Sequence, residues 1–132
     1  MKVLAQDLPT PILHRFVNWL RGPRQPWDVT GHCSERMADW HLTLADLDQC
    51  FQYGVLIEVS HDGQHLRCLL RDSNGICIVL VPARWLIVTC WRNDPSDNHA
   101  TINHGAYHRG DLPSYFLEEL PGGEPTQRVV YR

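Results

Sequence analysis

His32 and Arg36 stand four residues apart, so they share one face if residues 32–40 form a helix. Together they suit proton transfer beside a bound phosphate, as in metal-independent cleavage of RNA. That reaction needs a base for the ribose 2′-hydroxyl, an acid for the leaving 5′-oxygen and cations for the phosphorane charge. His32 is a candidate for proton transfer and Arg36 for a bidentate phosphate clamp. The alternative is helix capping by His32 and an ion pair of Arg36 with Glu35 or Asp39.

Basic residues also alternate along residues 65–71, where they would leave one face of a strand in the same direction. Arg84 or Arg92 would enlarge this group into a cationic patch over a sheet, which suits the phosphates of RNA. The alternative is a solvated strand face. The candidate catalytic set is His32, Arg36, His65, Arg67 and Arg71.

Three aromatic residues, Trp85, Trp91 and Tyr107, offer flat faces on which RNA bases can stack. Each stacked base contributes roughly 1–3 kcal/mol to binding. Core packing is the alternative for Trp91, because it belongs to an apolar run. The candidate substrate-binding residues are Arg84, Trp91 and Arg92.

The histidines after residue 93 raise the question of a metal. His104 and His108 would be neighbours on a helix, and with Asp97 they could hold zinc; solvated histidines, His99 included, are the alternative. The sequence has no Gly-rich phosphate loop, no HExxH, no GxSxG and no paired-carboxylate motif. We therefore assign no metal and no cofactor.

These side chains must be positioned by helices and strands. Thr10 and Pro11 open a predicted helix whose apolar stripe runs from Ile12 to Leu20. A second helix is predicted over residues 32–40 and a third, capped by Thr43, over residues 44–53. Gly54 fits the left-handed position that ends many helices.

The pattern then changes to strands, predicted at residues 55–60, 65–71, 76–81 and 86–92. Asp-Gly and Asn-Gly turns between them indicate consecutive hairpins, which form an antiparallel meander. In the second strand Leu66, Cys68 and Leu70 face one way and the basic residues face the other. We therefore expect an α+β fold in which N-terminal helices pack on one face of a four-stranded antiparallel meander, with the other face at least partly open.

Size and composition are those of one folded domain. The chain has 132 residues, of which 43% are hydrophobic and 20% charged. Its formal net charge of -3 argues against strong non-specific binding to a nucleic-acid backbone, but it leaves a locally basic site open. A DNA-binding regulator is disfavoured, because no predicted helix is rich enough in Lys and Arg to bind in a major groove.

Cysteine usage and hydropathy bear on the compartment. The five cysteines are an odd number without a CxxC pair, which does not indicate a disulfide framework. Cys68, Cys77 and Cys90 lie in apolar runs and are expected to be small buried hydrophobes. Residues 1–7 contain no signal-peptide-like run, and the longest apolar stretch, residues 76–90, is interrupted. We expect a cytoplasmic protein with no membrane association.

Residues 32–92 resemble an uncharacterised bacterial family of small domains with a His-x-x-x-Arg-Met helix, a Thr-capped helix ending in Gly, and a β-meander. The matching residues are His32, Arg36, Met37, Thr43, Asp46, Gly54, Gly75 and the strand that ends at Trp91. The family often has a second arginine near position 40, where this chain has Trp40 and then His41. In layout the family is similar to RelE-like and BrnT-like toxins, which are small ribonucleases with helices packed on an antiparallel sheet.

The chain is expected to be a single domain, 1–132, whose family-like core is residues 32–92. An extra N-terminal helix at residues 8–21 and an irregular C-terminal extension at residues 93–132 lie outside the resemblance. The resemblance implies a metal-independent endoribonuclease or toxin, with RNA or the ribosome as substrate and an antitoxin or immunity protein as partner. The alternative is a non-catalytic interaction module of a mobile element or phage on the same fold. In that case the helix Ile12–Leu20 is a candidate surface for a homodimer.

Overall fold

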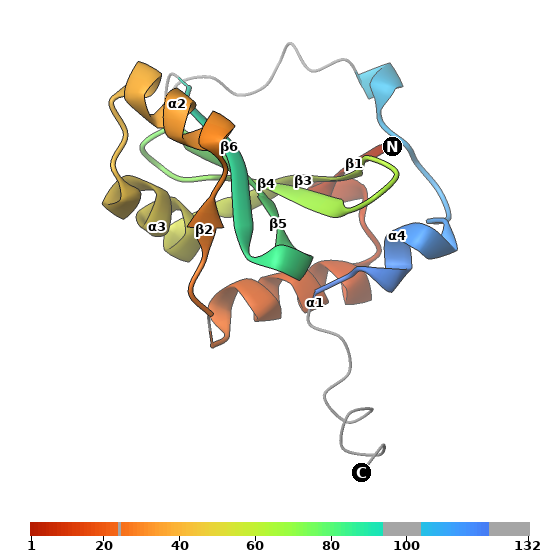
Figure 1. The fold of residues 1–132 in the computed structure, drawn as a ribbon. Coiled ribbons are helices and arrows are strands. Elements are labelled where there is room, and N and C mark those ends of the chain that lie inside the picture. Colours follow the sequence, from red (N-terminus) through yellow and green to blue (C-terminus); the bar gives the residue numbers. More distant parts are fainter. Residues whose placement is uncertain (24, 94–103, 122–132) are drawn as a thin grey trace.

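The computed structural model describes residues 1–23, 25–93 and 104–121. Within them, six strands form one sheet in the order β1-β3-β4-β5-β6-β2 (Figure 1). The strands are β1 (Lys2–Leu4), β2 (Asp28–Val29), β3 (Val55–His61), β4 (Leu66–Arg71), β5 (Ile76–Val81) and β6 (Leu86–Arg92). The α-helices are α1 (Thr10–Arg21), α2 (Gly31–Trp40), α3 (Leu44–Tyr53) and α4 (Ser114–Glu118).

The centre of the sheet is the predicted antiparallel meander of β3, β4, β5 and β6. The expectation of only four strands is wrong, because β1 adds antiparallel to β3 and β2 adds parallel to β6. The sheet is therefore mixed. Strands of three and two residues are too short to show a period in the sequence, and each pairs through backbone bonds with its neighbour. Asp28 N–H, for example, donates to the Trp85 carbonyl at 2.9 Å.

Side-chain caps fix where two of the helices begin. Thr30 Oγ1 accepts from Cys33 N–H at 3.0 Å, so Thr30 rather than His32 caps α2. Thr43 and Asp46 form a reciprocal capping box at the start of α3. No helix in the described segments has the length and apolarity that crossing a bilayer requires.

The expectation of a left-handed Gly54 is wrong, because its φ is -67° and its backbone is extended. Glycine is required there by space. A Cβ on Gly54 would lie 2.3 Å from the Cys50 carbonyl oxygen and 3.2 Å from Leu70 Cβ. The absence of a side chain lets the end of α3 lie directly against β4.

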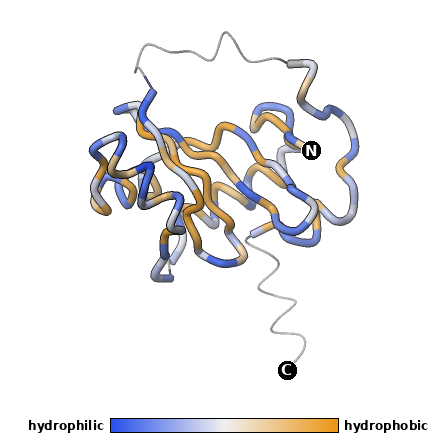
Figure 2. Tube along the Cα trace, turned by 45° about the horizontal axis from the view of Figure 1, so that its top comes forward, coloured by the Kyte–Doolittle hydropathy of each residue, from blue (hydrophilic) through white to orange (hydrophobic). Residues whose placement is uncertain are grey.

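The hydrophobic core lies between the sheet and the helices. Leu66, Cys68 and Leu70 face it, as their alternation predicts, and are at most 1% exposed. Phe16 and Leu20 of α1 are buried in the same core, so the stripe of α1 is largely used in folding. Hydrophobic residues are concentrated along the central strands (Figure 2).

Trp85 belongs to this helix-covered side. Its ring lies 5.1 Å from that of Trp19 and 5.7 Å from that of Phe51, between centroids. Trp85 therefore packs the turn between β5 and β6 against α1 and α3. All five cysteines are free and buried, which confirms the expectation for Cys68, Cys77 and Cys90.

Two irregularities shift the alternation of the outer meander strands. The register of β3 against β4 shifts between Leu56 and Glu58, and that of β5 against β6 shifts at Val79 and Leu80. As a result Ile87 and Cys90, three residues apart, both face the core. The bulge in β6 thereby turns Trp91 to the opposite, open face of the sheet.

Residues 104–121 return to the N-terminal edge of the sheet. His108 N–H donates to the Lys2 carbonyl at 2.7 Å, beside β1. Phe116 of α4 is completely buried in the core. This part of the C-terminal segment therefore forms a short helix, Ser114–Glu118, and is packed on the domain.

Candidate functional site

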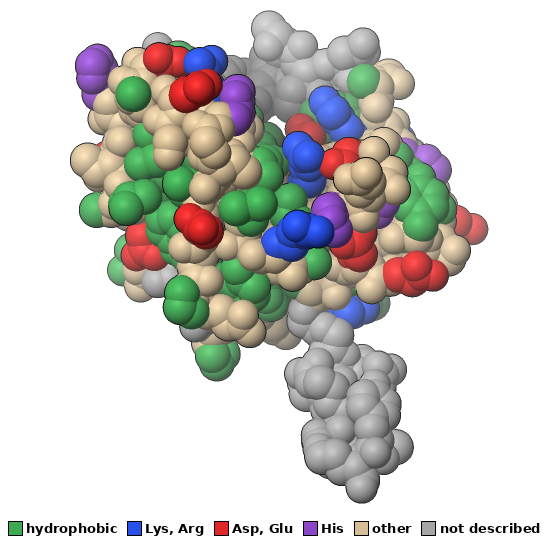
Figure 3. All heavy atoms as spheres, in the orientation of Figure 1, with side chains coloured by type: hydrophobic (Ala, Val, Ile, Leu, Met, Phe, Trp, Pro, Cys, Tyr) green, Lys and Arg blue, Asp and Glu red, His purple; other side chains and the backbone are tan. Residues whose placement is uncertain are grey.

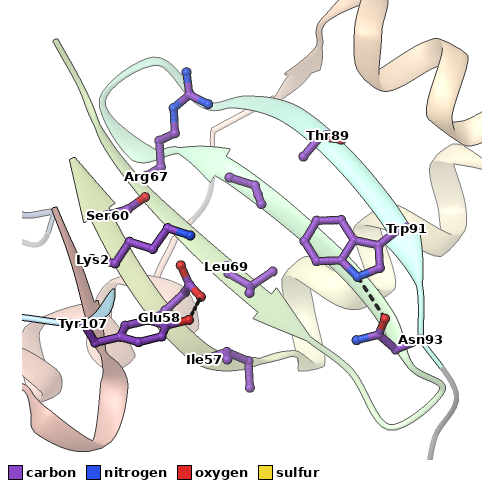
Figure 4. Close-up of a pocket in the computed structure, with 11 residues that line it drawn as sticks. Lys2, Ile57, Glu58, Ser60, Arg67, Leu69, Thr89, Trp91, Asn93 and Tyr107 are labelled. Atoms are coloured by element: carbon purple, nitrogen blue, oxygen red, sulfur yellow. Dashed lines mark hydrogen bonds between the residues drawn. The ribbon is translucent and has the colours of Figure 1, made fainter. Parts of the chain in front are cut away.

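The open face of the sheet carries a groove of about 470 Å³ (Figure 4). We call it the open-face groove. It is lined by Lys2, Ile57, Glu58, Ser60, Arg67, Leu69, Val79, Thr89, Trp91, Asn93 and Tyr107.

Strand pairing places these side chains in rows across the sheet. One row runs through the directly paired residues Glu58, Leu69, Val79 and Thr89 and forms the floor, which is apolar in its middle, at Leu69 and Val79. The neighbouring row is Lys2, Ser60 and Arg67. Trp91 pairs with Cys77 in the row on the other side. Adjacent rows lie two residues apart, so the cationic row and the indole flank the floor at about 7 Å on either side.

Among the residues that the structure describes, Glu58 is the one carboxylate that lines the groove. Tyr107 O–H donates to its Oε1 at 2.7 Å (Figure 4). Burial, followed by this bond to Glu58 and its negative charge, raises the pKa of Tyr107 to about 12. The phenol therefore stays protonated at neutral pH and holds the carboxylate in place.

Two cations stand on the side of the groove opposite Trp91. The Lys2 amine extends over the strands toward the middle of the groove (Figure 4). Arg67 donates to Asp62 at 2.8 Å, while its buried Nε has no hydrogen-bond partner within the described residues. Backbone N–H groups of His65 and Gln64, and then Arg67, lower the pKa of Asp62 to about 2. Asp62 is thus ionised at neutral pH and orients the guanidinium.

The charges around this region are mixed. In the orientation of Figure 1, Lys and Arg side chains gather near the middle of the visible face, with acidic and histidine side chains close by (Figure 3). Such a surface fits the net charge of -3. The positive charge on this face is therefore confined to a local group of side chains (Figure 3).

The aromatic side of the groove is built by Trp91 and Asn93. The Trp91 Nε1–H donates to Asn93 Oδ1 at 3.1 Å. In Figure 4 the indole is seen broadside over the strands, and the amide nitrogen of Asn93 lies on the groove side. The pair presents an apolar ring and two amide hydrogens next to each other.

The candidate catalytic residues of α2 lie outside the groove. Arg36 pairs with Asp39 at 2.7 Å, which is the ion pair considered as its structural alternative. His32 is exposed on the same helix. Because α2 packs on β6 in the helix layer, neither residue lines the open-face groove.

The candidate residues of the sheet are also separated. Of the proposed cationic patch, only Arg67 lines the groove. Arg71 lies one row beyond the floor, opposite Cys77. Arg84 is exposed on the 3₁₀ turn after β5, and Arg92 is exposed at the end of β6. Of the eight residues selected from the sequence, the groove contains Arg67 and Trp91.

His65 lies in the turn between β3 and β4 and contacts Glu119, the residue that follows α4. Its Nδ1 is 3.1 Å from Glu119 Oε1, and His61 Nε2 is 3.1 Å from Glu119 Oε2. His61 Nδ1 accepts from Gly63 N–H at 3.0 Å, so Nε2 carries the proton donated to Glu119. Partial burial would raise the pKa of Glu119, but the bonds from the two histidines outweigh it and the pKa is lowered.

Neither a metal nor a thiolate is indicated by this geometry. Within residues 1–23, 25–93 and 104–121, no group of three or more His, Cys, Asp or Glu side chains could hold a metal ion. Of the zinc candidates, Asp97 and the side chain of His104 lie outside what the structure describes, and His108 Nε2 lies 2.8 Å from the Asp111 carbonyl oxygen. Burial raises the pKa of Cys33 to about 12, so it is no nucleophile at neutral pH.

Sequence reasoning missed Lys2, Glu58 and Asn93. Lys2 belongs to a strand too short to recognise, and the bulge before Glu58 alters the alternation of β3. The polar interruption of an apolar strand at Glu58 is the one signal that pointed to it. No protein-family model matches the chain, and neither a curated protein nor a solved structure shows significant similarity to it.

Proposed function

We propose that this chain is a RelE-like, metal-independent ribonuclease or toxin domain whose site is the open-face groove. The observation that carries the proposal is the meeting of one carboxylate, two cations and one indole in that groove. These are the groups that RNA cleavage without metal needs: a base, charge stabilisation and a surface for a nucleobase.

Each groove residue has a role in the proposed reaction. Glu58 takes the proton from the ribose 2′-hydroxyl, and the 2′-oxygen forms a bond to phosphorus. The bond from phosphorus to the 5′-oxygen breaks, and Lys2 gives that oxygen a proton. Arg67, oriented by Asp62, stabilises the phosphorane charge. The products are a 2′,3′-cyclic phosphate and a 5′-hydroxyl.

The groove favours unpaired RNA. Trp91 is half-buried and lies beside the apolar floor of Leu69 and Val79, where a base can stack. In a duplex the base faces are already stacked on one another, so a duplex cannot use this surface. The substrate class is therefore a single-stranded loop or end.

The test compares Glu58→Gln with His32→Ala, using a mixed RNA pool in buffer containing a metal chelator. Glutamine keeps an oxygen that accepts from Tyr107 but cannot take the proton, so we expect cleavage to fall about 100-fold or more. His32→Ala, far from the groove, should cleave like the wild type. Cleavage lost in His32→Ala and kept in Glu58→Gln would place the site on α2 instead.

The toxin role has a separate test in cells. Expression of the wild type should arrest bacterial growth, and Glu58→Gln should relieve the arrest at equal protein levels. Normal growth with abundant folded wild-type protein would contradict a toxin.

An interaction module is the second candidate, favoured by apolar side chains at the α2–α3 connection. Trp40 is 43% exposed and Leu44 57% exposed. The homodimer surface proposed on α1 retains Val17, which is 40% exposed, since Phe16 and Leu20 are buried. The oligomeric mass is measured by light scattering. If the α2–α3 connection is the interface, Trp40→Lys should lower this mass; if α1 is the interface, Val17→Lys should lower it. A monomeric wild type would remove both surfaces.

A further inference from the structure

Asn93 has a fixed orientation because of its partner. An indole Nε1–H can only donate, so the atom of Asn93 that lies 3.1 Å from it must be the amide oxygen. The two amide hydrogens are consequently on the other side of the group. Figure 4 shows that side turned toward the groove.

A base stacked at Trp91 would meet this amide along its edge. Uracil presents a carbonyl acceptor there through O4, and guanine through O6, whereas adenine and cytosine present amino donors. An unengaged Asn side chain recognises adenine by using both its oxygen and its nitrogen. Here Trp91 occupies the oxygen, which leaves a group that offers hydrogens to the base.

We infer that Asn93 determines base specificity in the open-face groove, selecting single-stranded RNA with a carbonyl-bearing base, uracil or guanine, at Trp91. The inference rests on the proposed function, since it requires that RNA binds in the groove. Asn93 is a specificity residue and takes no part in proton transfer. Trp91 supplies stacking to every base, while Asn93 distinguishes among them.

The test measures binding of 2′-O-methyl hexanucleotides of uridine and of adenosine, which cannot be cleaved because the 2′-oxygen is blocked. Fluorescence anisotropy of labelled hexamers gives the two dissociation constants. We expect the wild type to bind the uridine hexamer about tenfold more tightly, the lower part of the range for base discrimination by a side chain.

Two variants separate the contributions of Asn93. Asn93→Asp keeps an oxygen for the indole but removes both donors, so the preference should reverse toward adenosine. Asn93→Ala removes the donors without adding charge, so the two hexamers should bind equally. Asn18→Asp, the same chemical change on the exposed surface of α1, should keep the uridine preference.

The outcomes distinguish the inference from the proposed function. Equal binding of both hexamers by the wild type, or a uridine preference that survives in Asn93→Asp, would overturn the role of Asn93 alone. No binding of either hexamer by the wild type would overturn the RNA groove itself, and the specificity of Asn93 with it.

Discussion

Gly54 lies between the last turn of α3 and Leu70 of β4, and its replacement by alanine tests how tightly the chain is packed at this point. The φ of -67° is one that alanine adopts readily. If only the backbone mattered, Gly54→Ala would stabilise the fold by about 0.4–1 kcal/mol, because alanine lowers the conformational entropy of the unfolded chain. A steric clash outweighs this gain, because the new Cβ would lie 2.3 Å from the Cys50 carbonyl oxygen.

That distance cannot persist, so the backbone where α3 ends must shift, and Leu70 Cβ of β4, 3.2 Å from the new Cβ, leaves little room for the shift. The displacement strains the Gly54 N–H to Cys50 carbonyl bond, now 2.7 Å, and loosens packing against Leu70. Overpacking of this kind costs about 1–3 kcal/mol. We expect a net loss of about 2 kcal/mol in the free energy of unfolding, equivalent to a melting temperature about 8 °C lower.

Urea denaturation followed by tryptophan fluorescence measures this loss. Gly31→Ala is the matched control: it lies at the start of α2, and an added Cβ there meets nothing within 4 Å. It should leave stability unchanged or raise it by up to about 1 kcal/mol. If Gly54→Ala unfolds at the same urea concentration as Gly31→Ala, the tight packing of Gly54 against Cys50 and Leu70 is refuted.

Three further predictions concern the residues around the site. An ultraviolet titration should show one tyrosine that ionises near pH 12, and Tyr107→Phe should remove that step; its persistence would contradict the burial beside Glu58. Because the folded pKa of Glu119 is lowered, its contribution to stability is present above pH 4.5 and is lost as the pH falls through the folded pKa. Urea midpoints of the wild type should therefore exceed those of Glu119→Gln at pH 7 and converge at low pH, and equal midpoints at pH 7 would count against the two histidine contacts. Phe116→Ala should lower the unfolding free energy by about 3–5 kcal/mol, and a change below about 1 kcal/mol would show that α4 is not part of the core.

The helices and hairpins were predictable because local residues determine them. Thr43 and Asp46 cap α3 by bonding to each other's backbone, and both residues are visible in the sequence. Gly63 and Gly75, with φ of +96° and +81°, close the turns between β3, β4 and β5. Each of these signals acts over four residues or fewer, so no tertiary information is needed to recognise it.

The edges of the sheet and the composition of the groove could not be predicted in the same way. Lys2 reaches the site through pairing with Ser60, a contact between distant parts of the chain. Arg67 and Trp91 are recognisable in the sequence by their residue types. The register shifts that bring Glu58 and Trp91 to the same face of the sheet leave no periodic signal in the sequence. Arg84 and Arg92 lie away from Arg67 because Arg84 follows the end of β5 and Arg92 ends β6. The position of a strand end is not visible in residue type, so the predicted cationic patch was too large.

The placement of β1 and β2 has a consequence for the order of folding. Residues 1–30 supply both outer strands of the sheet, yet Lys2 pairs with Ser60 and Asp28 pairs with Leu86. Closing such long loops is entropically costly until the meander between them exists. The N-terminal part of the chain is therefore synthesised before its partners and docks after them. During that interval the apolar stripe of α1 has no core to enter, which makes this interval the one most exposed to chaperones and to aggregation.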